Sequence, residues 1–174
     1  MASTYTPIAT TTLGSAASNI TFSSIPSIYT DLVIVLSNIV CSVNSSNILL
    51  EVGTGGSVDG TTTYSYTNVT GDGTTARSNR ASSGTKILIA YNQGASNSSS
   101  YPSQANYNIM NYANTSTYKT VLARGTVFNA TGGETSAVVG LWRNTAAIDI
   151  VKLYPDTGNY NAGTVATLYG IKAA

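Results

Sequence analysis

Apolar and polar residues alternate along much of this chain, which is the pattern of β-strands that bury one face. The alternation is clearest at 19–23, where Ile20 and Phe22 share a face, and at 62–70, where Tyr64 and Tyr66 do. Further strand-like runs follow at spacings of about 10–15 residues, and no stretch shows a helical stripe. We therefore predict an all-β fold, a jelly-roll-like antiparallel β-sandwich of about ten strands. The other strands predicted are 32–40, 48–52, 86–91, 105–113, 118–129, 135–143, 147–154 and 163–171.

The length of 174 residues predicts a single domain with, at most, a short appendage. Residues 1–12 are expected to form an N-terminal arm or an edge strand, because Pro7 has no backbone N–H to donate to a neighbouring strand. Residues 13–174 are expected to form the sandwich. Within it, the run Leu32-Val33-Ile34-Val35-Leu36 is apolar on both faces, which favours a central strand or a strand at a subunit contact.

The last two apolar runs, 148–154 and 163–171, flank a cluster of turn residues that includes Pro155, Asp156 and Gly158. Alternating runs on either side of such a cluster are typical of a β-hairpin. We therefore expect these two strands to pair with each other.

Two long segments, 71–84 and 92–103, lack a clear strand signal and are predicted to be loops. Loops longer than about 12 residues are usually functional, so we expect contacts with a partner there. Arginines in the first loop could reach an acidic surface, and tyrosines near the second offer rigid, amphipathic contact area. Solvated charges and strand-face packing are the alternatives. The candidate partner contacts are Arg77, Arg80, Tyr101 and Tyr107.

The composition supports the β prediction and narrows the range of partners. The chain has 22 Ser, 26 Thr and 16 Asn, residues that favour strands and turns over helix interiors, and its 42% hydrophobic share is enough for a core. With 9% charged residues and a net charge of +1, no electrostatic case exists for nucleic acid or an anionic membrane as partner. There is no apolar run of about 18 residues for a membrane span, and no signal-peptide pattern. We expect a protein that is made in a cytoplasm and is not secreted.

The residue types that carry most enzymatic chemistry are scarce. The chain has no histidine, which removes the commonest general base and the commonest metal ligand. Its seven Asp and Glu residues are scattered and form no calcium loop, although a distant pair of the glycosidase kind stays open. The lone Cys41 lies in an apolar run and is expected to be a buried structural thiol. We predict a protein that is not an enzyme and that uses no cofactor or metal.

Segments near both ends resemble a known family. Near the start stands Ile8-Ala9-Thr10-Thr11-Thr12-Leu13-Gly14-Ser15-Ala16-Ala17, followed by Ile20-Thr21-Phe22-Ser23-Ser24-Ile25-Pro26; near the end stand Leu153-Tyr154-Pro155-Asp156-Thr157-Gly158-Asn159 and Ala166-Thr167-Leu168-Tyr169-Gly170-Ile171. These segments are similar to small phage virion structural proteins, the capsid decoration or cement proteins of cyanophages and other tailed phages, and to related C-terminal domains of tail fibres.

The resemblance implies a component of the virion that is assembled in the host cytoplasm. We expect a capsid decoration protein, a homotrimer that bridges neighbouring copies of the major capsid protein and stabilises the assembled head. The alternative is the receptor-binding tip of a tail fibre, which would recognise a host surface polysaccharide through uncharged loops rich in Tyr and Asn. An enzyme acting on polysaccharide is the third reading.

Overall fold

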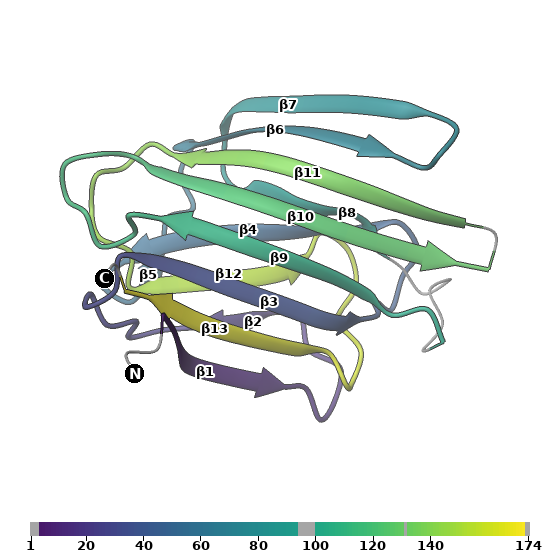
Figure 1. Cartoon of the computed structure of the whole chain (residues 1–174), viewed down its shortest axis with the longest axis horizontal. Helices are drawn as coiled ribbons and strands as arrows, with labels where there is room; N and C mark the ends of the chain where they lie inside the picture. The colour runs from purple at the N-terminus through teal and green to yellow at the C-terminus, as the bar shows by residue number, and fades with distance from the viewer. Residues whose placement is uncertain (1–3, 94–99, 131, 173–174) are drawn as a thin grey trace.

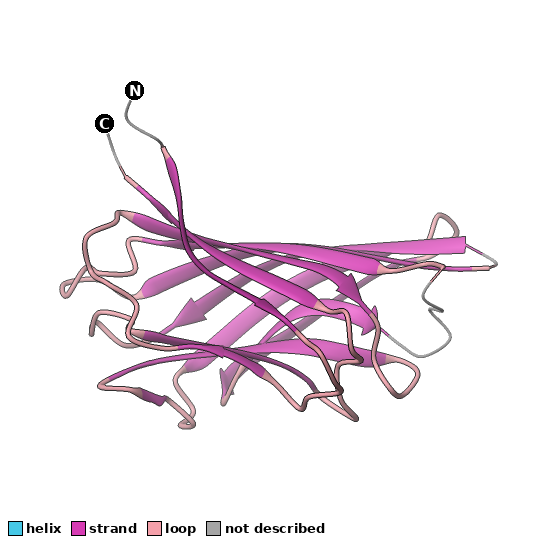
Figure 2. Cartoon of the chain, turned by 90° about the horizontal axis from the view of Figure 1, so that it is seen from below, coloured by secondary structure: helices cyan, strands magenta, loops and turns pink. Residues whose placement is uncertain are grey.

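The computed structural model describes residues 4–93, 100–130 and 132–172. These residues form thirteen strands and no helix, and the strands make two antiparallel sheets that stack face to face (Figures 1 and 2). The predicted all-β antiparallel sandwich is confirmed, with more strands than the ten or so expected. Within the described residues, no helix has the length and apolar character needed to cross a membrane.

The larger sheet has eight strands and lies in front in Figure 1, and the smaller sheet lies behind it. Every pairing between named strands is antiparallel, and the chain passes repeatedly from one sheet to the other. In spatial order, the large sheet consists of β1 (Tyr5–Thr12), β13 (Val165–Ile171), β3 (Asp31–Ile39), β9 (Ser103–Met110), β10 (Lys119–Asn129), β11 (Gly132–Trp142), β6 (Tyr64–Gly71) and β7 (Ala76–Gly84). The small sheet consists of β2 (Ile20–Phe22), β12 (Ile150–Pro155), β4 (Ser46–Thr54) and β5 (Ser57–Val58), with β8 (Ile87–Gln93) paired to β4.

The core fills the space between the two sheets. In the central strands, alternate residues point inward, as the burial of Leu32, Ile34 and Leu36 on β3 illustrates. They face a second apolar layer from the small sheet, which includes Ile48 and Leu50 of β4. Burial of such side chains contributes about 25 cal/mol for each Å² of apolar surface, so this layer is the main source of stability.

The predicted pairing of the last two strands is wrong. β12 lies in the small sheet between β2 and β4, whereas β13 lies in the large sheet between β1 and β3. The segment 156–164 crosses from one sheet to the other, and its Tyr160 is fully buried and bridged to Ala17 and Cys41. The turn residues after β12 do mark a connection between strands, but the alternation of apolar and polar residues does not indicate which strands pair.

The predicted loop 71–84 is also wrong, because most of it is β7, the edge strand that pairs with β6. The turn between them is held by Asp72, whose carboxylate accepts hydrogen bonds from the backbone N–H groups of Thr74 and Thr75. β7 is exposed along almost its whole length, so its sequence carries no apolar alternation. In the other predicted loop, 92–103, residues 94–99 lie outside the described part of the chain.

At the opposite edge of the large sheet, β13 is the one strand among the described residues that pairs with β1, and the pairing shifts register between Pro7 and Ala9. Next to β13 lies β3, the run that is apolar on both faces. Its inward residues are buried, and its outward Val33 and Val35 are half-buried on the outer face of the sheet.

Candidate interaction surface

The outer face of the large sheet carries two rows of side chains that run across five strands. In one row, Val35 of β3 lies opposite Asn106 of β9, which lies opposite Arg124 of β10. The row continues through Ala137 of β11 to Val69 of β6. The second row lies two residues away along each strand and consists of Val33, Asn108, Leu122, Val139 and Thr67. We call these ten residues the large-sheet face.

Most of the large-sheet face is aliphatic and open to solvent. The side chains of Leu122, Val139 and Val69 have relative exposures of 43%, 48% and 55%. Single exposed apolar residues are ordinary, but these three are neighbours across adjacent strands. A contiguous exposed apolar patch is characteristic of an interaction site.

Two shallow hollows lie on this face and share Leu122 and Arg124. The larger, of about 490 Å³, extends toward β3 and has Tyr5 of β1 on its rim. The smaller, of about 350 Å³, extends toward β6 and is lined by Val69, Ala137 and Val139. The residues of β9 and β10 that line the larger hollow are Asn106, Asn108, Leu122 and Arg124. The face therefore has relief, with Leu122 and Arg124 standing between two depressions.

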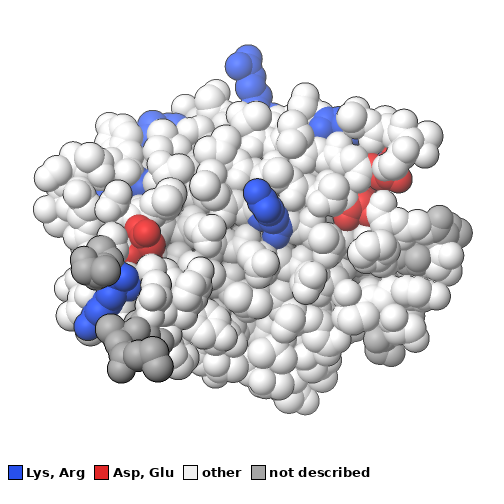
Figure 3. Space-filling model, in the orientation of Figure 1, with Lys and Arg blue, Asp and Glu red and all other residues white. Residues whose placement is uncertain are grey.

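Charge is sparse on this surface, and uncharged atoms cover most of it in Figure 3. Of the outward-facing residues on the six strands from β13 to β6, only Asp31 and Arg124 are charged. Asp31 lies at the start of β3, where its carboxylate accepts a hydrogen bond from the backbone N–H of Asn111 at 2.7 Å. Arg124 lies in the middle of β10, inside the large-sheet face.

Three of the four predicted contact residues lie on the surface. Arg77 is exposed on β7 and forms ion pairs with Asp72 at 2.9 Å and with Glu134 at 3.7 Å. Arg80 is exposed on the same strand, opposite Thr67, and Tyr101 is exposed just before β9. Arg77 and Arg80 thus share β7, whereas Tyr101 lies elsewhere, before β9. Their role as contacts stays a prediction.

The fourth predicted contact, Tyr107, is corrected by the structure. Its side chain has a relative exposure of 0%, and it packs in the core between the sheets. Along β9, Tyr107 has the same parity as the buried Ala105 and Ile109, whereas Asn106 and Asn108 point outward. A buried side chain cannot contact a partner.

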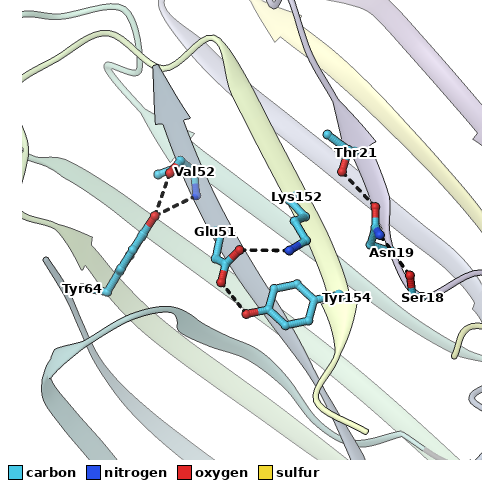
Figure 4. A network of polar contacts seen from close by, with 8 residues as sticks. All are labelled: Ser18, Asn19, Thr21, Glu51, Val52, Tyr64, Lys152 and Tyr154. Carbon is cyan, nitrogen blue, oxygen red and sulfur yellow. Dashed lines mark hydrogen bonds and ion pairs between the residues drawn. The ribbon is translucent and has the colours of Figure 1, made fainter. Parts of the chain in front are cut away.

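The carboxylates of the chain are engaged within its own fold. Figure 4 shows Glu51 of β4 between two residues of β12: it accepts a hydrogen bond from Tyr154 at 2.6 Å and pairs with Lys152 at 3.3 Å. Asp149 accepts the backbone N–H groups of two turn glycines at 2.8 and 3.2 Å. The other contacts are Asp31 with Asn111, Asp59 with Thr61, Thr63 and Trp142, Asp72 with Thr74 and Thr75, Glu134 with Arg77, and Asp156 with Ser46 and Asn47.

No group of acidic or cysteine side chains within the described residues gathers closely enough to hold a metal ion. The prediction of a buried thiol is confirmed, because Cys41 is free and fully buried. Burial raises the pKa of this thiol to about 12, against an opposing hydrogen bond from Ser46. At neutral pH the group is therefore protonated and unreactive.

Sequence reasoning missed Arg124 and Leu122, the residues that stand at the centre of the large-sheet face. A signal for them exists in the segment Val121-Leu122-Ala123-Arg124-Gly125, where Val121, Ala123 and Gly125 are buried and the residues between them point outward. An arginine that alternates with buried residues in a central strand is placed on the face of a sheet.

Comparison of the sequence with protein-family models gives no match, and comparison with curated proteins gives none either.

Proposed function

We propose that this chain is a structural protein of a phage virion, a capsid decoration protein that binds the assembled head and stabilises it. The observation that carries the proposal is the large-sheet face, a contiguous, largely aliphatic surface with few charges. The resemblance of both ends of the chain to small virion proteins supports the same assignment.

The outer side of the large sheet has the area that such an attachment needs. Its eight strands have seven or more residues each. At about 4.8 Å between strands and about 3.3 Å per residue, they cover roughly 40 by 23 Å, or about 900 Å². Each partner in a standard protein interface contributes about 800 Å². One sheet therefore provides a complete binding surface.

The mechanism is binding linkage. A protein that binds the assembled shell and not its separated subunits stabilises the shell by its own binding free energy, about 2.7 kcal/mol per site at a hundredfold excess over Kd. When one chain contacts two neighbouring capsid subunits at once, its binding free energy opposes the separation of those subunits. A homotrimer would engage several sites together and multiply weak contacts.

The proposal is tested by the copy number of the chain in purified virions. Densitometry against the major capsid protein should give hundreds of copies per particle, as expected of a protein that covers the head. A count of a few dozen copies or fewer would refute a decoration role. A second test is stability: heads that lack the chain should release their DNA at a lower temperature than heads to which it has been added back.

The second candidate is the tip of a tail fibre that recognises host surface polysaccharide. One observation favours it: the larger hollow brings the amides of Asn106 and Asn108 together with Arg124 and with Tyr5 on the rim. Amides, a guanidinium and an aromatic ring can bind sugar hydroxyls, an acidic sugar and a sugar face. A low copy number combined with specific binding to a polysaccharide would favour this candidate over the first.

A further inference from the structure

Arg124 stands in the centre of the large-sheet face, between aliphatic side chains toward β11 and the amides of Asn106 and Asn108 on β9. It lies on the fifth of eight strands, and its outward neighbours include Leu122 on its own strand and Ala137 on β11. Among the described residues, none accepts a hydrogen bond from its guanidinium or forms an ion pair with it. Five N–H donors are thus presented at the middle of a surface that is largely aliphatic and has few charges.

Four other cationic side chains of the protein form hydrogen bonds or ion pairs within the fold. Arg77 and Lys152 form ion pairs with carboxylates. Arg143 donates to Ser65 and to the carbonyl of Thr62, and the buried Lys119 donates to two backbone carbonyls. Arg124 has no such role. Arg80 of β7, opposite Thr67 at the margin of the face, likewise has no side-chain hydrogen bond or ion pair among the described residues, but Arg124 lies inside the large-sheet face.

Covering the face brings Arg124 out of water. A buried guanidinium without an acceptor is strongly unfavourable, so the surface that covers it must supply one. A carboxylate fits the planar fork of the guanidinium with two parallel hydrogen bonds. Around this pair, Val35, Leu122 and Val139 require apolar side chains opposite them. The combination of arginine and apolar residues with few Lys, Glu or Asp is that of the centre of a protein interface.

A second copy of this chain is a poor source of that carboxylate. Each of its seven acidic side chains already accepts hydrogen bonds or forms an ion pair within its own fold, including Asp31 at the margin of the same face. A polysaccharide fits only part of this face: the polar and aromatic groups lie in the larger hollow, whereas Leu122, Val139 and Val69 beside it offer a sugar neither a stacking ring nor a hydrogen bond. Both observations favour a different protein as the occupant.

We infer that the large-sheet face binds the capsid shell at a site where the shell presents an Asp or Glu carboxylate to Arg124, within a ring of apolar side chains. This inference rests on the proposed function and names the chemistry of the capsid contact. Arg124 is the anchor of the interface, in the way that desolvated arginines are often the residues that dominate binding.

The test uses purified heads from a phage in which the gene for this chain is disrupted. The purified full chain is added to these heads, and its binding is measured by co-sedimentation. Four proteins are compared: the wild type, Arg124→Glu, Arg124→Gln and, as a control, Lys86→Glu. Lys86 is an exposed cation just before β8, off the large-sheet face, so its reversal changes the net charge equally. Thermal unfolding of each variant verifies that it is folded. If Arg124→Glu does not fold, Arg124→Gln, which introduces no negative charge, replaces it in the binding test.

We expect the wild type and Lys86→Glu to bind with equal affinity, and both Arg124 variants to bind at least about 30-fold more weakly, the usual loss when one partner of a buried charge pair is removed. If Arg124→Glu and Arg124→Gln bind within twofold of the wild type, the inference is wrong while the proposed function stands. If the wild type itself does not bind heads, the proposed function fails and the inference with it. Binding of the wild type to polygalacturonate that depends on Arg124, without binding to heads, would assign the hollow to an acidic polysaccharide instead.

Discussion

Replacement of Tyr64 by phenylalanine tests how a backbone position of the small sheet without a strand neighbour on one side, Val52, obtains its hydrogen bonds. The hydroxyl of Tyr64, from β6 of the large sheet, accepts a hydrogen bond from the backbone N–H of Val52 at 3.0 Å and donates one to its carbonyl at 2.7 Å (Figure 4). Val52 lies where the neighbours of β4 change, because β8 pairs with residues 46–50 and β5 with 53–54. The tyrosine hydroxyl thus takes the place of a missing strand.

The magnitude follows from counting what the substitution leaves unpaired. The carbonyl of Val52 also accepts the N–H of Asp59 at 2.9 Å and keeps that partner in Tyr64→Phe. The N–H of Val52 loses its acceptor, and both residues are fully buried. An unsatisfied buried donor costs about 1–3 kcal/mol. Because the phenyl ring keeps the shape of the side chain, no cavity term is added. For a chain of this size, a mid-range loss of about 2 kcal/mol lowers Tm by about 4–8 °C.

The assay is urea unfolding followed by the fluorescence of Trp142, the single tryptophan, which is fully buried. The matched control is Tyr107→Phe, since Tyr107 is equally buried and its hydroxyl has no hydrogen-bond partner among the described residues. We expect Tyr107→Phe to unfold at the wild-type midpoint or slightly above it. Equal unfolding free energies for the two variants would show that the hydroxyl of Tyr64 does not satisfy Val52, and would refute the reasoning.

Three further predictions follow from buried or paired groups. Desolvation raises the pKa of Asp59, but hydrogen bonds, led by that from Thr61, lower it overall from 3.8 to about 2. The free energy of unfolding should therefore fall as the pH drops from about 4 to about 2. In acid titrations, Asp59→Asn should lose less stability over this range than the wild type. Gly140→Ala places a methyl group 2.7 Å from the side chain of the buried Ile87 and should cost about 1–3 kcal/mol in chemical unfolding, whereas Gly71→Ala, with nothing within 4 Å, should cost much less. The thiol of Cys41 should not react with Ellman's reagent until the chain is unfolded, and rapid labelling of the native protein would contradict its burial.

Alternation along the chain was sufficient to predict the fold class and most strands. It works where one face is buried and the other is open, as in β9, whose residues alternate strictly between buried and exposed. The same parity places Tyr107 inward, so its burial was available from the sequence. Tyrosine is also enriched at interfaces, so its residue type allows a contact where the parity of β9 predicts burial.

Two features could not be obtained from alternation. β7 has solvent on both faces and a neighbour on one side only, so its residues carry no pattern that distinguishes it from a loop. The partners of β12 and β13 depend on which sheet each strand joins, and that is decided by contacts between segments far apart in the chain. Arg124 belongs to a third kind: its outward position is predictable, but its lack of a partner is a property of the assembled sheet.

The position of β13 in the large sheet has a consequence for synthesis. Within the part of the chain that the structure describes, β1 has no strand partner other than β13, although about 150 residues separate them, and β3 lies on the other side of β13. While the ribosome is still adding the residues before 165, β1 is unpaired and β3 presents a bare edge that carries Val33 and Val35. Pairings so distant in sequence form slowly, and open apolar edges invite association between chains. We therefore expect the yield of soluble protein to depend on how quickly the final strand follows its predecessors out of the ribosome.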